Sequence, residues 1–177
     1  MQNDRNSRRA APVAALLILG TLAAGAVGYN QYGTRAQDHS APDQSGSETR
    51  EELLELVTAA GVRALSVEVA RTTDQQALGL MFRTSLPDTK GMLFPHDEPR
   101  ESTMWMRNTY IPLDMVFINA DGTVHRIEKR TEPFSERIIP SNGPVAAVLE
   151  IAGGAADRMG LKAGDKVRHP MFEAGRK

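Results

Sequence analysis

Apolar and polar residues alternate along the second of two neighbouring segments near residue 60. The sequence ALSVEVA, residues 64–70, places aliphatic side chains at every second position, which is typical of a half-buried strand. The preceding EELLELVTAA, residues 51–60, is ambiguous, because its Leu and Glu content favours a helix by propensity alone. Gly61 lies between the two segments and fits a turn. We therefore expect residues 53–58 and 62–70 to pair as a β-hairpin.

Apolar stretches bounded by turn residues predict more strands later in the chain, at residues 114–119, 123–129 and 145–151. Asp121-Gly122 separates the first two, and we expect a tight hairpin turn with positive φ at both positions. A last short strand should follow the turn at Gly164-Asp165.

Two short helices are expected, at residues 73–80 and 155–159. Thr73 or Asp74 can cap the first, whereas Gly79 and Gly160 can end the first and the second in a left-handed conformation. Residues 83–103 contain three prolines and are expected to form loops. Many short strands with two brief helices predict a mainly β fold, a compact antiparallel β-barrel or jelly-roll-like sandwich.

The N-terminus carries a different signal. Three Arg in the first nine residues precede residues 10–27, an apolar stretch without any charge. We interpret residues 1–28 as a signal peptide or an N-terminal membrane anchor, because 18 residues fit either role. Residues 29–50 are polar and Gly/Ser-rich and are expected to be a disordered linker, which leaves residues 51–177 as a single β-rich domain. The protein is thus expected to be exported, periplasmic or secreted, and anchored to the inner membrane if residues 10–27 are retained.

The composition of the chain limits the kinds of ligand and site that it can have. The 177 residues include 21 Lys and Arg against 22 Asp and Glu, so a net charge of −1 gives no general attraction to nucleic acid. The chain has no Cys, which excludes a lipoprotein anchor, disulfides and thiolate-ligated metals. The four His show no ligand spacing, and no cofactor is expected.

Several motifs in a fixed order resemble one family, the bacterial and archaeal domain of unknown function numbered 192. They are GLMFR (79–83), LP followed by GMLF (86–94), MWMRNTYIPLDMVFI (104–118), the Asp-Gly turn, VLEI (148–151) and MGLKAGDKV (159–167). The resemblance implies a compact, frequently exported β-barrel or jelly-roll-like domain without an established activity. Arg107 stands where the family often has Lys, and Met104 where an aromatic residue is more usual.

The first candidate site is a polar and aromatic platform. If residues 104–108 form a strand, Trp105 and Arg107 share one face, and Asn108 lies beside them. Such a set can stack a sugar or flat group, pair with an anion and fix its orientation. The alternative is structural, with Trp in the core and the Arg-Asn pair bound to loop carbonyls.

The second candidate is acidic. Asp114 shares strand parity with Val116 and Ile118, so we expect a buried carboxylate that needs a partner, with Arg83 or Arg107 the nearest candidates. Asp114 could form a structural ion pair or act as a general acid or base, and the same two roles apply to Glu150.

The third candidate is the methionine cluster. Met104 and Met106 offer two thioethers to Cu(I), although Met also fills cores.

From the sequence as a whole we expect an exported binding or accessory module. Its site would lie where residues 95–103 approach the platform, and its partner would be an envelope glycan, peptide or protein. The alternatives are an enzyme acting on envelope glycan through Asp114 or Glu150, and a Cu(I)-handling protein.

Overall fold

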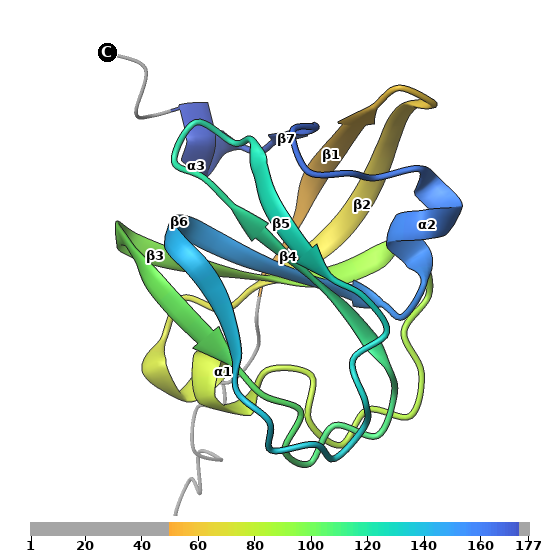
Figure 1. Ribbon diagram of the computed structural model, residues 1–177, viewed down its shortest axis with the longest axis vertical. Helices are drawn as coiled ribbons and strands as arrows, with labels where there is room; N and C mark the ends of the chain where they lie inside the picture. The colour runs from red at the N-terminus through yellow and green to blue at the C-terminus, as the bar shows by residue number, and fades with distance from the viewer. Residues whose placement is uncertain (1–49, 174–177) are drawn as a thin grey trace, which may run out of the picture. The chain divides into compact units, whose positions relative to one another are not determined.

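The fold was analysed in a computed structural model, which describes residues 50–173 (Figure 1). Within that range the chain forms seven strands and three short helices. In chain order they are β1 (Glu51–Thr58), β2 (Gly61–Val69), α1 (Thr73–Leu78), β3 (Lys90–Met104), β4 (Leu113–Ile118), β5 (Val124–Glu128), β6 (Ile139–Ala152), α2 (Ala155–Met159), β7 (Lys166–Arg168) and α3 (Pro170–Glu173). No helix among these residues is long and apolar enough to span a membrane. The predicted signal or anchor, and all but the last residue of the predicted linker, lie outside the described residues.

The strands form one curled, half-barrel sheet in the order β5-β4-β6-β3-β2-β1-β7. Every neighbouring pair is antiparallel except β2 and β3. The two edges approach each other, because Thr123, just before β5, bridges to Lys166 in β7. The mainly β class predicted from the sequence is confirmed.

The hairpin near residue 60 is also confirmed. β1 and β2 pair in register from Glu51 with Glu68 to Thr58 with Gly61. Leu54, Leu56 and the alternating aliphatic residues of β2 are buried, so burial of one face decides against the helix that Leu and Glu content favours. The later strands β4 and β5 also match their predicted segments within two residues.

The prediction of loops at residues 83–103 is wrong, because β3 runs from Lys90 to Met104. Pro95 pairs with Ala147 of β6 and Arg100 pairs with Val145, so residues 96–99 bulge out of the ladder. Proline lacks a donor, but a bulge does not require one. This irregularity keeps a single long strand in place despite Pro95 and Pro99.

Two turn details also differ from the prediction. Between β4 and β5, only Gly122 has a positive φ, 82°, because Asn119 and Gly122 close a longer turn. Helix α1 is capped by Thr72 rather than by Thr73 or Asp74: the Thr72 side chain accepts a hydrogen bond from the Gln75 backbone N–H, and the Gln75 side-chain oxygen accepts one from the Thr72 backbone N–H. Gly79 ends α1 with a positive φ of 51°, although its ψ of −135° is not left-handed helical. Gly160 ends α2 in the expected left-handed conformation.

The sheet is buried on both faces, and all six residues of β4 are buried. One face packs a cluster that includes Leu54, Val116 and Phe172, and the other packs Met92, Phe94 and Phe117 with neighbouring side chains. Successive residues of β4 and β6 therefore point into different cores. This alternation separates the two buried acids discussed below.

Candidate functional site

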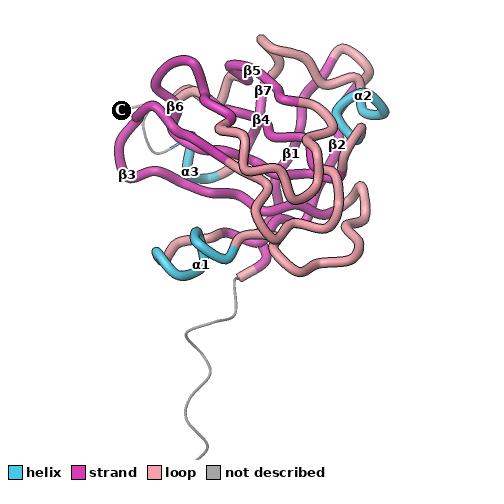
Figure 2. The backbone as a smooth tube through the Cα atoms, turned by 60° about the horizontal axis from the view of Figure 1, so that its bottom comes forward, coloured by secondary structure: helices cyan, strands magenta, loops and turns pink. Residues whose placement is uncertain are grey.

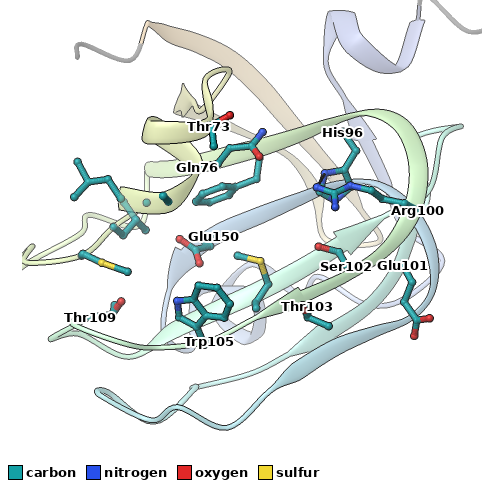
Figure 3. A pocket seen from close by; sticks show the side chains of 17 residues that line it. Thr73, Gln76, His96, Arg100, Glu101, Ser102, Thr103, Trp105, Thr109 and Glu150 are labelled. Atoms are coloured by element: carbon teal, nitrogen blue, oxygen red, sulfur yellow. Dashed lines mark hydrogen bonds between the residues drawn. The ribbon is translucent and has the colours of Figure 1, made fainter. Parts of the chain in front are cut away.

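A cleft of about 340 Å³ opens between α1, the outer part of β3 and the segment that follows β3 (Figure 3). Its lining is about half polar and half apolar. The lining residues used below are Gln76, Phe94, His96, Arg100, Trp105 and Glu150. A hollow that combines apolar walls with polar groups can orient a bound small molecule.

Glu150 lies at the inner end of this cleft. It pairs with Met92 of β3 and Met115 of β4, so its side chain projects into the second core among apolar neighbours. Only 4% of the residue is exposed, and within residues 50–173 its carboxyl group makes no hydrogen bond. Burial raises the pKa of Glu150 to about 8, against a smaller opposing effect of Arg83. Glu150 is therefore mostly protonated at neutral pH and can donate a hydrogen bond.

Arg83 does not pair with Asp114, contrary to our expectation. Its guanidinium forks onto both carboxyl oxygens of Glu68, with an Nη2 to Oε2 distance of 2.7 Å. This interaction raises the pKa of Arg83. Arg83 therefore affects Glu150 only through its charge.

Trp105 forms one side of the cleft and is 43% exposed. It follows the last residue of β3, so the predicted strand does not extend through it. Trp105 and Arg107 nevertheless lie together as expected, with the guanidinium carbon 5.6 Å from the ring centroid. Arg107 also contacts Glu136, with Nε 3.3 Å from Oε1, and is not a lining residue of the cleft. In Figure 3 the Trp105 ring and the Glu150 carboxyl group face the same space.

Asn108 lies outside the cleft. It has a positive φ of 55°, and its carbonyl accepts a hydrogen bond from the Phe82 backbone at 2.9 Å. Asn tolerates this conformation better than most residues. Asn108 therefore shapes the loop, and its side chain reaches the cleft only indirectly, through Nδ2 at 3.9 Å from Sδ of the lining residue Met81.

Asp114 is fully buried, as its parity predicted, but neither Arg83 nor Arg107 is its partner. One carboxyl oxygen accepts hydrogen bonds from the Arg130 and Gly154 backbones, both at 2.8 Å, and the other accepts one from Ala156 at 2.9 Å. Three backbone donors satisfy the carboxylate without a cation. Asp114 pairs with Ile151 across the sheet, so Asp114 and Glu150 project from opposite faces. The structure does not bring the two acids into one site.

The two methionines proposed for Cu(I) have different surroundings. Met106 is fully buried and its sulfur accepts a hydrogen bond from Thr131 at 3.0 Å, whereas Met104 lines the cleft. This placement of Met106 suits core packing. Copper binding stays an untested prediction.

A model of the family DUF192, described as "Uncharacterized ACR", matches residues 55–169, which run from β1 to just past β7. The chain belongs to the DUF192 family. The resemblance noted in the sequence is thereby confirmed. A search among curated proteins found no match.

Two solved structures resemble this DUF192 protein. A Sinorhizobium meliloti protein described as a "putative transcription regulator" is 43% identical, with a TM-score of 0.67 over 68% of this chain and 95% of the other. A protein of unknown function from Novosphingobium aromaticivorans is 44% identical, with a TM-score of 0.66 over 67% of this chain and 85% of the other. Both resemble this chain in sequence and in fold.

The outer end of the cleft in this DUF192 domain was missed in the sequence, because His96 falls within residues 83–103, which were predicted to form loops, and the His residues showed no ligand spacing. The bulge in β3 brings His96 Nδ1 within 3.3 Å of Arg100 Nη2. Burial, followed by the charge of Arg100, lowers the pKa of His96, so its ring is neutral at pH 7. Its Nε2 atom is buried without a partner among the described residues. Gln76 holds α1 against this end by donating to the Ala70 and Pro95 carbonyls, both at 3.1 Å.

Proposed function

We propose that this DUF192 domain is an exported binding module whose cleft holds an uncharged, ring-bearing polar ligand of the envelope, such as an N-acetylated hexose unit of a glycan. The observation that carries the proposal is Glu150, a buried carboxyl group without a hydrogen-bond partner in the described chain, at the inner end of a cleft beside an exposed Trp.

A fully buried unpaired polar group destabilises a protein by about 1–3 kcal/mol, and Glu150, which is 4% exposed where it lines the cleft, incurs part of this cost. Leu or Met would fill the same position among Met92, Met115 and Phe94 at no such cost. A local conflict of this kind is expected at a functional site, where a ligand supplies the missing partner. The carboxylic acid of Glu150 can donate to a carbonyl or hydroxyl oxygen of that ligand.

The remaining walls fit a ring with polar substituents. The indole face of Trp105 can stack on the apolar face of a sugar, and Arg107 lies against the ring without lining the cleft. Because Glu150 is mostly neutral at pH 7, it favours an uncharged group over an anion at the inner end. An acetamido group offers both an acceptor oxygen and a methyl group to such a site.

Export is supported by the charge-free residues 10–27 that follow three Arg. An envelope glycan would then be within reach of the domain. This part of the proposal depends on the sequence alone.

The competing function is an enzyme that acts on glycan with Glu150 as general acid, for which a pKa of about 8 is suitable. Glycoside hydrolysis usually needs a second carboxylate across the scissile bond. Of the described residues, the other acidic lining residue is Glu101, which is exposed and lies near the opposite end of the cleft in Figure 3. Asp114 is saturated by the backbone and faces another core. Binding is therefore favoured over hydrolysis.

The test uses the sole Trp of the chain, Trp105, as a fluorescent reporter. We expect N-acetylglucosamine and its β-1,4 disaccharide to shift its emission saturably. Glu150→Gln, which keeps a donor, should retain binding and lose its pH dependence above pH 7. Glu55→Gln, a change in an exposed ion pair with Arg168, is the matched control. The absence of any saturable shift in the wild type would contradict the ligand class, and release of free sugar from the disaccharide would favour the enzyme.

A further inference from the structure

Three aromatic side chains project into solvent at one end of the molecule. Phe82, Tyr110 and Phe134 are 55%, 43% and 60% exposed. Tyr110 lies between the other two, with centroid distances of 6.0 Å to Phe82 and 5.2 Å to Phe134. We call these three residues the aromatic face. It is built from three separate loops, so it does not follow from any one sequence motif.

The backbone holds two of these rings in an unfavourable conformation. Phe82 and Phe134 have positive φ angles of 63° and 61°. For a bulky residue this costs about 1–2 kcal/mol relative to the right-handed region. Their backbone N–H groups donate to carbonyls of the same loop, Phe82 to Asn108 at 2.9 Å and Phe134 to Thr109 at 3.1 Å. Strained and exposed positions occupied by Phe rather than Gly or Asn indicate that the rings themselves have a use.

Arginines near the aromatic face in the sequence are paired. Arg107 contacts Glu136, and Arg137 contacts Glu128 with Nη2 2.6 Å from Oε1. Glu132, two residues before Phe134, is exposed and has no ion pair within residues 50–173, so the face offers apolar rings without a basic patch. This suits the interfacial region of a phospholipid bilayer, where aromatic rings are enriched.

The point where the chain enters the domain lies toward the same end. Arg50, just before β1, accepts a hydrogen bond from Val69, the last residue of β2, and β2 leads into α1 and Phe82. Figure 1 shows α1 and the loops that follow β3 and β5 toward one end of the domain and the β1–β2 turn at the other, and Figure 2 shows α1 below the strands. The 22 residues at positions 29–50 separate the apolar segment from β1. A chain of that many residues spans at most roughly 75 Å when fully extended.

We propose that the aromatic face rests on the phospholipid surface to which residues 10–27 attach the protein. The inference depends on the export part of the proposed function and on retention of residues 10–27 as an anchor, and not on the ligand. A tether of this length keeps the domain close to the bilayer, so even a weak interfacial contact is populated. The contact would orient the cleft, whose Trp105 belongs to the same loop as Tyr110, toward the membrane-proximal envelope.

The test uses the full chain in phosphatidylcholine vesicles that contain brominated phosphatidylcholine, which quenches nearby Trp. Two reporters are compared, each in a Trp105→Phe background: Phe134→Trp in the aromatic face and Val62→Trp beside the β1–β2 turn. Val62 is also exposed. We expect at least about twofold stronger quenching of the first reporter, because only that end reaches the interface.

A second variant separates the contact from folding. Phe82→Asn with Tyr110→Ser removes two rings from the Phe134→Trp reporter, and Asn suits the left-handed backbone at position 82. Quenching should fall toward the value of the Val62→Trp reporter while the thermal midpoint stays within a few degrees. Equal quenching of both reporters, or unchanged quenching after loss of the rings, would overturn the proposal. Quenching that depends on protein density would instead assign the face to self-association.

Flotation of the same vesicles distinguishes the two proposals. If the chain does not float with the vesicles, anchoring fails and the membrane contact fails with it, whereas the glycan titration is unaffected. If the chain floats and the reporters do not differ, only the membrane contact is wrong.

Discussion

At the scale of single residues, the two buried acids, Asp114 and Glu150, have opposite surroundings. Asp114 accepts three backbone hydrogen bonds, whereas Glu150 makes none within residues 50–173. The first is bound as firmly as a structural carboxylate can be, and the second weakens the fold when it ionises. A buried carboxyl group therefore has a structural role on one face of the sheet and a candidate binding role on the other.

Replacing Asp114 with Asn should destabilise the fold by about 2–4 kcal/mol. The amide has a single acceptor oxygen and would turn its own N–H groups toward backbone donors. Urea denaturation measures the change in the free energy of unfolding. Glu136→Gln, which breaks an exposed ion pair, is the control and should cost less than about 1 kcal/mol. A loss for Asp114→Asn as small as that of the control would refute this account of Asp114.

Glu150 should make stability depend on pH. Its pKa rises from 4.5 to about 8 on folding, so the folded state binds more protons between these values. The free energy of unfolding should then fall as pH increases from about 4.5 to 8, by up to about 1.4 kcal/mol per pH unit, and this contribution should level off above 8. The difference between wild type and Glu150→Gln, measured by denaturation from pH 5 to 9, isolates this contribution. Parallel curves for the two proteins would contradict the raised pKa.

At the scale of elements, the pattern of apolar residues together with the turn signals was enough to predict β1, β2, β4, β5 and the centre of β6. It failed for β3, because Pro95 and Pro99 suggest a loop and only the pairing with β6 shows that a bulge accommodates them. It also placed Asp114 correctly in a core but gave it the wrong partners. The donors Gly154 and Ala156 lie 40 and 42 residues away. Because every residue except Pro has a backbone N–H, the residue types do not reveal which one will be a donor. The aromatic face was missed for a similar reason, since its rings meet only after three loops pack.

The cap of α1 gives a direct comparison of sequence and structure. Thr72→Ala should cost about 1 kcal/mol, because it removes the hydrogen bond to the Gln75 backbone. Thr73→Ala, at the neighbouring position favoured by the sequence, should change stability by a few tenths of a kcal/mol. Thermal denaturation of the two variants measures both effects. Equal losses, or a larger loss for Thr73→Ala, would contradict the observed cap.

At the scale of the whole molecule, the residues important for stability and those of the candidate binding site lie on different faces of the curled sheet. One core and the Asp114 network join the sheet to α2, whereas the other core opens into the cleft beside α1 and Trp105. The cleft and the aromatic face both include residues from loops toward the end where the chain enters. In the proposed account, that end meets both the ligand and the membrane.

The most direct test of the central claim is the affinity of Glu150→Leu for the N-acetylglucosamine disaccharide, measured by Trp105 fluorescence at pH 7 beside its free energy of unfolding. Leu fits the apolar surroundings of Glu150, so we expect a protein at least as stable as the wild type. Binding should nevertheless weaken by about tenfold or more, because the ligand loses its buried hydrogen bond. A stable Glu150→Leu protein that binds the disaccharide as well as the wild type would contradict the claim that Glu150 is retained for a ligand.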